Sequence, residues 1–313
     1  MNLLQSMNYE EFLDRVRTMA EHRTGGEAQV TIRPILKNNN LRLDGLLILY
    51  PGENISPALY LNQYYARYLG GIPMEMILDE IFATYESCRC PDRFDLDQLR
   101  DFDALKKHLS VRLISHSANE ALLQTVPYIP FLDLAAVFSL TIETGALGTS
   151  TIQVRNEYLE FWNVDTEDLY RTALENLRNQ DAPAFFPLSS LAGSSGGEQI
   201  LSTVYVLTNQ TKLYGASFLL SKRTLAAFAE RHGDFYILPS SVHEVILVPC
   251  STGFSPASLL GMLRDVNRTD LETEDILSDN LYVYRRNEHS LGLLLVHPSD
   301  SAKKETAICT ADH

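Results

Sequence analysis

The stretch that decides the fold is DFYILPSSVHEVILVP, residues 234–249. Two short apolar runs, 235–238 and 245–248, stand on either side of a polar turn of one proline and two serines. Apolar runs of this length that flank a turn are typical of a β-hairpin. We therefore predict two antiparallel strands in a half-buried sheet.

The same plan recurs along the chain. Further strand pairs are expected at 30–36 with 41–50, 131–142 with 150–154, 203–207 with 215–220, and 281–284 with 291–296. Apolar residues at helical spacing predict amphipathic helices, several of which follow a capping residue: Asn8, Ser56, Asp165, Ser221 and Ser255. The pattern predicts an α+β fold, in which antiparallel sheets built from hairpins carry amphipathic helices on their faces.

A change of composition suggests how the chain is divided. Between Pro187 and Glu198 the sequence becomes LSSLAGSSGG, which is typical of a flexible loop or a boundary. We predict two α+β subdomains, 1–188 and 198–300, with a single continuous domain as the alternative. Residues 193–197 also match the Gly-x-Ser-x-Gly pattern of hydrolases, but a nucleophile elbow needs a preceding strand and a following helix, and here a strand is expected to follow.

Composition excludes several classes of partner. Hydrophobic residues make up 45% of the chain and charged residues 21%, which is ordinary for a globular protein. The 26 Lys and Arg residues face 40 Asp and Glu residues, so the formal net charge is −14. Such a chain repels nucleic acid and anionic membranes. Because no apolar run approaches the roughly 18 residues of a membrane span, we expect a soluble protein with no nucleic-acid or membrane partner.

The cysteines indicate a reducing compartment. Cys88, Cys90, Cys250 and Cys309 are too few for a disulfide framework in 313 residues. Cys88 and Cys90 lack both the spacing and the second pair of a zinc knuckle. The N-terminal stretch shows no basic region followed by an apolar one, so we expect no signal peptide. We predict a cytoplasmic location, with no metal and no cofactor.

The turn at the head of the second strand carries the candidate catalytic residues. Histidine exchanges protons near neutral pH, so His243, oriented by Glu244, could activate Ser240 or Ser241. However, neighbouring residues on a strand point to opposite faces, so His243 and Glu244 cannot pair without a bulge. The alternative is structural: the serines satisfy backbone groups of the turn and the histidine bonds a neighbouring strand.

One acidic residue stands inside an apolar run. Asp133 interrupts FLDLAAVFSLTI, residues 131–142. A buried carboxylate is costly unless it is hydrogen-bonded, so Asp133 is either a structural acceptor or a functional acid. We therefore add Asp133 to the candidate catalytic residues.

A row of tyrosines supplies candidate ligand-binding residues. Tyr60, Tyr64 and Tyr68 recur at every fourth position of the helix expected after Ser56. Such a row could stack against a base or a sugar, although aromatic residues at this spacing usually bury their rings and leave only the hydroxyl groups in water.

Several motifs together carry a family resemblance. They are Asn38-Asn39 with Gly45-Leu46, NISPALYLNQYYARYLGG at 54–71, PYIPFLDLAAVF at 127–138, YVLTN at 205–209 and ILPSSVHEVILVP at 237–249. They resemble a family of unknown function from gut anaerobic bacteria of the clostridial group, over nearly the whole chain. The second half more loosely resembles the YtpQ-type family of bacterial proteins. These resemblances imply a bacterial cytoplasmic origin and one integrated α+β fold, but no catalytic residue or cofactor.

Two functions remain open from the sequence. We favour a binding or regulatory module, which recognises another protein or a small molecule through a sheet face or the tyrosine helix. The alternative is a hydrolase or transferase that uses Ser240, Ser241, His243 and Glu244.

Overall fold

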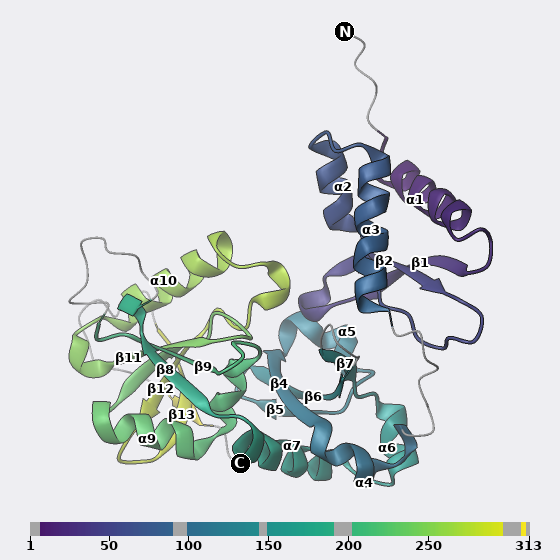
Figure 1. Ribbon diagram of the computed structural model, residues 1–313. Helices are drawn as coiled ribbons and strands as arrows, with labels where there is room; N and C mark the ends of the chain where they lie inside the picture. The colour runs from purple at the N-terminus through teal and green to yellow at the C-terminus, as the bar shows by residue number, and fades with distance from the viewer. Residues whose placement is uncertain (1–6, 90–98, 144–148, 191–201, 297–307, 311–313) are drawn as a thin grey trace. The chain divides into compact units, whose positions relative to one another are not determined.

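The computed structural model describes residues 7–89, 99–143, 149–190, 202–296 and 308–310 (Figure 1). Its antiparallel sheets and accompanying helices confirm the predicted α+β fold. By their contacts the residues form two compact units: the first holds 1–37, 41–100 and 142–151, and the second holds 38–40, 101–141 and 152–313. The boundary expected near 188–198 falls largely on residues 191–201, outside the described part, and the predicted subdomain division stays a prediction.

Where the structure describes it, the first unit contains a three-stranded sheet and three α-helices (Figure 1). The strands are β1 (Gln29–Leu36), β2 (Arg42–Leu49) and β3 (Leu59–Tyr60), and the helices are α1 (Tyr9–Arg23), α2 (Leu61–Leu69) and α3 (Met74–Cys88). Strands β1 and β2 form the predicted hairpin, with Val30 opposite Ile48. One face of the sheet and the three helices share a core that includes Phe12, Leu46 and Ile81.

Local sequence explains where one helix of this unit begins but not where the next one does. Helix α1 starts with a capping box, in which the Asn8 side chain accepts from the Glu11 amide and the Glu11 carboxylate accepts from the Asn8 amide, both at 2.9 Å. The prediction that Ser56 caps the next helix is wrong, because α2 begins at Leu61. The Ser56 hydroxyl instead accepts from the Ile48 amide of β2 at 3.0 Å, so this serine serves the sheet.

The second unit contains a seven-stranded antiparallel sheet. Its order is β14-β13-β12-β10-β11-β9-β8, with β8 at Pro183–Pro187, β9 at Tyr205–Asn209, β10 at Phe235–Leu238, β11 at Val245–Pro249, β12 at Leu281–Arg285, β13 at Ser290–Leu294 and β14 at Ile308–Thr310. The hairpin predicted first is confirmed, because β10 and β11 pair from Phe235 opposite Pro249 to Leu238 opposite Ile246.

Both faces of this hairpin are covered, so the expectation of a half-buried sheet is wrong. Helices α9 (Lys222–His232) and α10 (Pro256–Thr269) lie on opposite sides of the sheet (Figure 1). On the α9 side the rings of Phe228 and Phe235 lie 4.8 Å apart, while Tyr236 packs in the cluster that contains α10 residues. All four side chains of β10 are buried as a result.

A second sheet, of which all but residues within 142–151 belongs to the same unit, has four strands. These are β4 (Leu109–Ser115), β5 (Tyr128–Phe131), β6 (Leu134–Glu143) and β7 (Thr149–Gln153), and β6 pairs with the other three. Short helices α4 (Phe102–Leu105), α5 (Glu120–Leu123) and α6 (Asn156–Trp162) surround it, and α7 (Thr166–Gln180) packs on β4 and β5. As predicted, Asp165 caps α7, accepting from the Asp168 amide at 2.8 Å.

Membrane insertion of a helix finds no support here. Among the described residues, no helix combines the length and the apolar character that crossing a bilayer requires.

The core of the first unit gives a direct test. Leu46 is fully buried, so Leu46→Ala should lower the free energy of unfolding by about 2–5 kcal/mol through lost contacts and a residual cavity. Leu69 is 55% exposed, so Leu69→Ala should change the free energy of unfolding by less than about 0.5 kcal/mol. Urea titration followed by far-ultraviolet circular dichroism measures both. Equal losses from the two variants would contradict the assigned core.

Candidate functional site

The side chain of His243 has partners at both ring nitrogens. Nδ1 accepts from the Tyr214 amide at 3.2 Å, and Nε2 lies 3.1 Å from Oδ1 of Asp275. A nitrogen that accepts a hydrogen bond from an amide carries no proton, so the proton of the neutral ring is on Nε2 and is donated to Asp275. This histidine has no free lone pair with which to take a proton from a substrate.

The candidate serines are built into a pair of adjoining loops. Residues 239–242 run antiparallel to 275–278, with hydrogen bonds from the Val242 amide to the Asp275 carbonyl and from the Leu277 amide to the Ser240 carbonyl, both at 2.9 Å. We call these two segments the paired loops. Ser240 and Ser241 are both buried there.

The Ser241 hydroxyl therefore faces the backbone. Its Oγ accepts from the His243 amide at 3.1 Å, and it is not a partner of the imidazole ring. Glu244 is half-buried, and within the described residues it has no ion-pair partner. The structure thus brings the His243 imidazole to Asp275, a residue that the sequence did not single out, and pairs the ring with neither Glu244 nor a serine hydroxyl.

Asp133 lies in the turn before β6 and binds three donors. Its Oδ2 accepts from the Ser278 hydroxyl at 2.6 Å and from the side-chain amide of Asn280 at 2.9 Å. Its Oδ1 accepts from the Tyr282 hydroxyl at 2.5 Å. Burial, followed by the nearby Asp133 carboxylate, raises the pKa of Tyr282 well above its usual value. This geometry favours a structural acceptor, and none of its hydrogen bonds leads to His243.

Two of the three candidate tyrosines have unlike surroundings. Tyr60 precedes α2, and the Lys37 ammonium lies 4.7 Å from the centre of its ring. Tyr64 is buried, and its hydroxyl donates to Oγ1 of Thr84 at 3.3 Å. The two rings therefore do not share one stacking surface.

The third tyrosine is part of an aromatic cluster. Tyr68 lies 5.7 Å from Phe12 and 6.2 Å from Tyr65, measured between ring centres. Its hydroxyl accepts from the Met7 amide at 3.1 Å. Tyr68 thus packs its ring and leaves only the hydroxyl for polar contacts.

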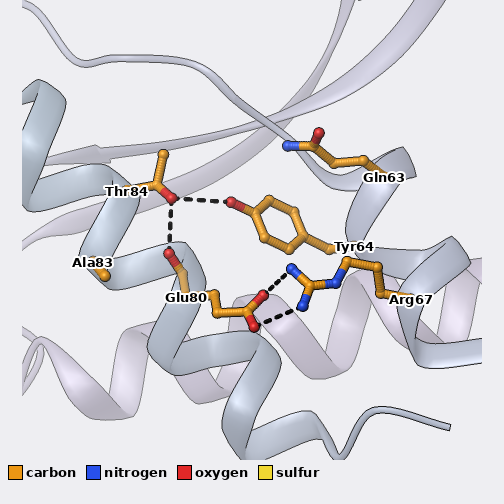
Figure 2. A pocket seen from close by; sticks show the side chains of 6 residues that line it. All are labelled: Gln63, Tyr64, Arg67, Glu80, Ala83 and Thr84. Carbon is orange, nitrogen blue, oxygen red and sulfur yellow. Dashed lines mark hydrogen bonds and ion pairs between the residues drawn. The ribbon is translucent and has the colours of Figure 1, made fainter. Parts of the chain in front are cut away.

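A pocket of about 320 Å³ opens between α2 and α3. Its lining comprises Gln63, Tyr64 and Arg67 from α2, and Glu80, Ala83 and Thr84 from α3 (Figure 2). Arg67 and Glu80 form a two-pronged ion pair, with Nη2 of Arg67 2.8 Å from Oε1 of Glu80 and a second contact between Nη1 and Oε2. Tyr64 is the one candidate ligand-binding residue that lines this pocket.

The chemistry of the pocket is polar but balanced in charge. One wall holds the cation and the anion of the ion pair, while the Tyr64 ring and the Gln63 amide lie across from it (Figure 2). The side chains of Arg67 and Glu80 are 49% and 34% exposed, so a ligand can reach both. Sequence reasoning missed this pair, although the short connection through Gly70 and Gly71 could have indicated that the two helices lie side by side.

No metal site emerges. The residues that the structure describes contain no group of three His, Cys, Asp or Glu side chains able to hold an ion. Cys88 is an exposed free thiol, whereas Cys90 lies outside the described residues.

Comparison with known proteins places the chain. A family model described as "Family of unknown function (DUF5688)" matches residues 9–286. The chain belongs to this family. DUF5688 covers the α2–α3 pocket, the paired loops and His243, and it confirms the resemblance to a family of unknown function. No curated protein and no solved structure matches the chain.

The structural role of the His243 imidazole in this DUF5688 chain can be tested by substitution. His243→Ala leaves the Tyr214 amide without its acceptor, which should cost about 1–3 kcal/mol in the free energy of unfolding. His243→Asn places an oxygen near the position of Nδ1, so it should cost less. Guanidinium titration followed by the fluorescence of Trp162, the single tryptophan, measures both variants.

The control is His108→Ala, since His108 is exposed in the same unit. If His243→Ala were as stable as this control, the structural role of the imidazole would be ruled out.

Proposed function

We propose that this protein is a ligand-binding module whose α2–α3 pocket accepts a small zwitterion, such as a free amino acid or a dipeptide. The observation that carries the proposal is the accessible Arg67–Glu80 ion pair in the pocket wall. The volume of about 320 Å³ is at the lower end of the roughly 300–1,000 Å³ of small-molecule sites. It suits a molecule of amino-acid size.

The ion pair matches the two charges of a zwitterion. A guanidinium presents a planar fork to a carboxylate, and a carboxylate accepts hydrogen bonds from an ammonium. Exposed ion pairs contribute only about 0–1 kcal/mol, so separating Arg67 from Glu80 costs little. A zwitterion between them replaces one ion pair with two.

The neighbouring side chains can hold the ligand in one orientation. The Tyr64 hydroxyl donates to Thr84, whose own hydroxyl donates to the Glu80 carbonyl at 2.9 Å, so the pocket floor is fixed before a ligand arrives. The Gln63 amide offers a donor and an acceptor at the rim (Figure 2). A prearranged site loses less entropy on binding.

The hydrolase or transferase alternative has weaker support. Its central residue, His243, uses one ring nitrogen on the Tyr214 amide and the other on Asp275. General base catalysis requires a nitrogen within reach of the substrate proton. We therefore place function in binding.

We also propose the bacterial cytoplasm as the location of this module. The free, exposed thiol of Cys88 suits a reducing compartment, in which disulfides are rare.

A ligand screen with matched variants tests the pocket. Free amino acids at millimolar concentration should raise the melting temperature of the full chain, and isothermal titration should give a saturable curve for the best of them. Arg67→Met and Glu80→Gln should each weaken that binding by about 1.5–3 kcal/mol, the usual contribution of a hydrogen bond to a charged group.

The controls separate the pocket from general charge effects. Arg23→Met removes another exposed ion pair between helices of the same unit, that of Arg23 with Asp79, and should leave the affinity unchanged. The N-acetyl and the amide forms of the best ligand each lack one charge and should both bind more weakly. Equal binding by wild type and Arg67→Met would refute the proposal.

A further inference from the structure

Arg112 on β4 is a half-buried cation in unusual surroundings. Its Nε donates to Oγ of Ser139 at 2.9 Å, and its guanidinium carbon lies 4.3 Å from the centre of the Tyr214 ring. The Tyr214 ring lies 5.1 Å from the ring of His243. The guanidinium is therefore held between the four-stranded sheet and an aromatic side chain.

None of these partners carries a negative charge. Within the described residues, no carboxylate forms an ion pair with Arg112, although the chain has 40 acidic residues. A half-buried arginine usually pairs with a carboxylate, and Arg285 of the same unit does so with Asp234 at 3.1 Å. Arg112 instead has the Ser139 hydroxyl and the side chain of Tyr214 as its partners.

The charge of Arg112 is nonetheless partly withdrawn from water, because its side chain is half-buried. Burial lowers the pKa of Arg112, and the Tyr214 side chain acts in the opposite direction. A guanidinium stays protonated at neutral pH all the same. A partly desolvated charge without a counter-ion is unfavourable, and a bound anion would reduce that penalty.

The surroundings of Arg112 are rigid. Tyr214 adopts the left-handed region, with φ at 57°, and its amide is fixed to His243. The next residue, Gly215, donates its amide to the His243 carbonyl at 2.9 Å, and a Cβ there would lie 2.4 Å from Oγ1 of Thr208. A strained backbone held by its neighbours is common at ligand sites.

We propose that Arg112 anchors a second binding site, specific for a singly charged oxyanion, namely the carboxylate of a small organic acid. The fork of a guanidinium binds a carboxylate through two parallel hydrogen bonds. One cation balances one negative charge, while the imidazole of His243 is already committed to Tyr214 and Asp275. The ring of Tyr214 supplies an apolar surface beside the charge. This site belongs to the second unit and does not rest on the α2–α3 pocket.

Titration with simple anions tests the site. Acetate and N-acetylglycine are the carboxylate probes and inorganic phosphate is the competing oxyanion, each added to the full chain at constant ionic strength with chloride as the reference. We expect saturable stabilisation by the carboxylates, its loss in Arg112→Met, and at least about tenfold weaker binding in Arg112→Lys, which keeps the charge but not the fork.

Arg286→Met is the matched control, because Arg286 is exposed in the same unit and the change also removes one positive charge. It should bind the carboxylates like wild type. No saturable response to either carboxylate, an unchanged response in Arg112→Met, or binding of phosphate alone would each overturn the assignment.

A second measurement needs no ligand. Methionine keeps the apolar stem and removes the uncompensated charge, so in chloride buffer Arg112→Met should unfold at a denaturant concentration no lower than wild type does. A marked loss of stability would show that the guanidinium is already satisfied within the protein, and it would overturn the proposal.

Discussion

The backbone hydrogen bonds between the paired loops, residues 239–242 and 275–278, are the constraint on which the second unit depends. Buried amides and carbonyls must find partners, and these two segments supply them to each other. The pairing also brings Asp275 to His243. The Asn39 side chain adds to it, donating to the carbonyls of Thr273 at 2.8 Å and Ile276 at 2.6 Å. Three stretches that are far apart in sequence, at Asn39, 239–243 and 273–278, thus stabilise a single polar arrangement.

The side chains that the sequence marks as reactive already use their hydrogen-bonding groups on other residues of the protein, whereas different residues have groups left for a ligand. Asp133 receives three hydrogen bonds, and His243 uses both nitrogens. By contrast, Arg67 and Glu80 face a pocket, and Arg112 has no counter-ion among the described residues. Residue type alone does not decide what a side chain can do, because the hydrogen bonds already made determine what is left for a ligand.

Local signals predicted much of the fold, but the polar sites depend on contacts that no local pattern encodes. The hairpin of β10 and β11 and the cap at Asp165 follow from neighbouring residues. Gly215–Leu220 was expected to be a strand and is a 3₁₀ helix, since six consecutive buried residues carry no period that separates the two. Asp275 lies 32 positions from His243, so only the pairing of the two loops could reveal it.

The close packing around Gly215 has a consequence for recognising distant relatives. A Cβ at this position would come within 2.7 Å of the His243 carbonyl, as well as meeting Thr208, and backbone atoms cannot move aside as a flexible side chain can. A homologous chain that keeps this crossing therefore needs glycine here, whereas it can exchange the imidazole for another acceptor. Gly215 should therefore identify homologous chains with this architecture more reliably than His243 does.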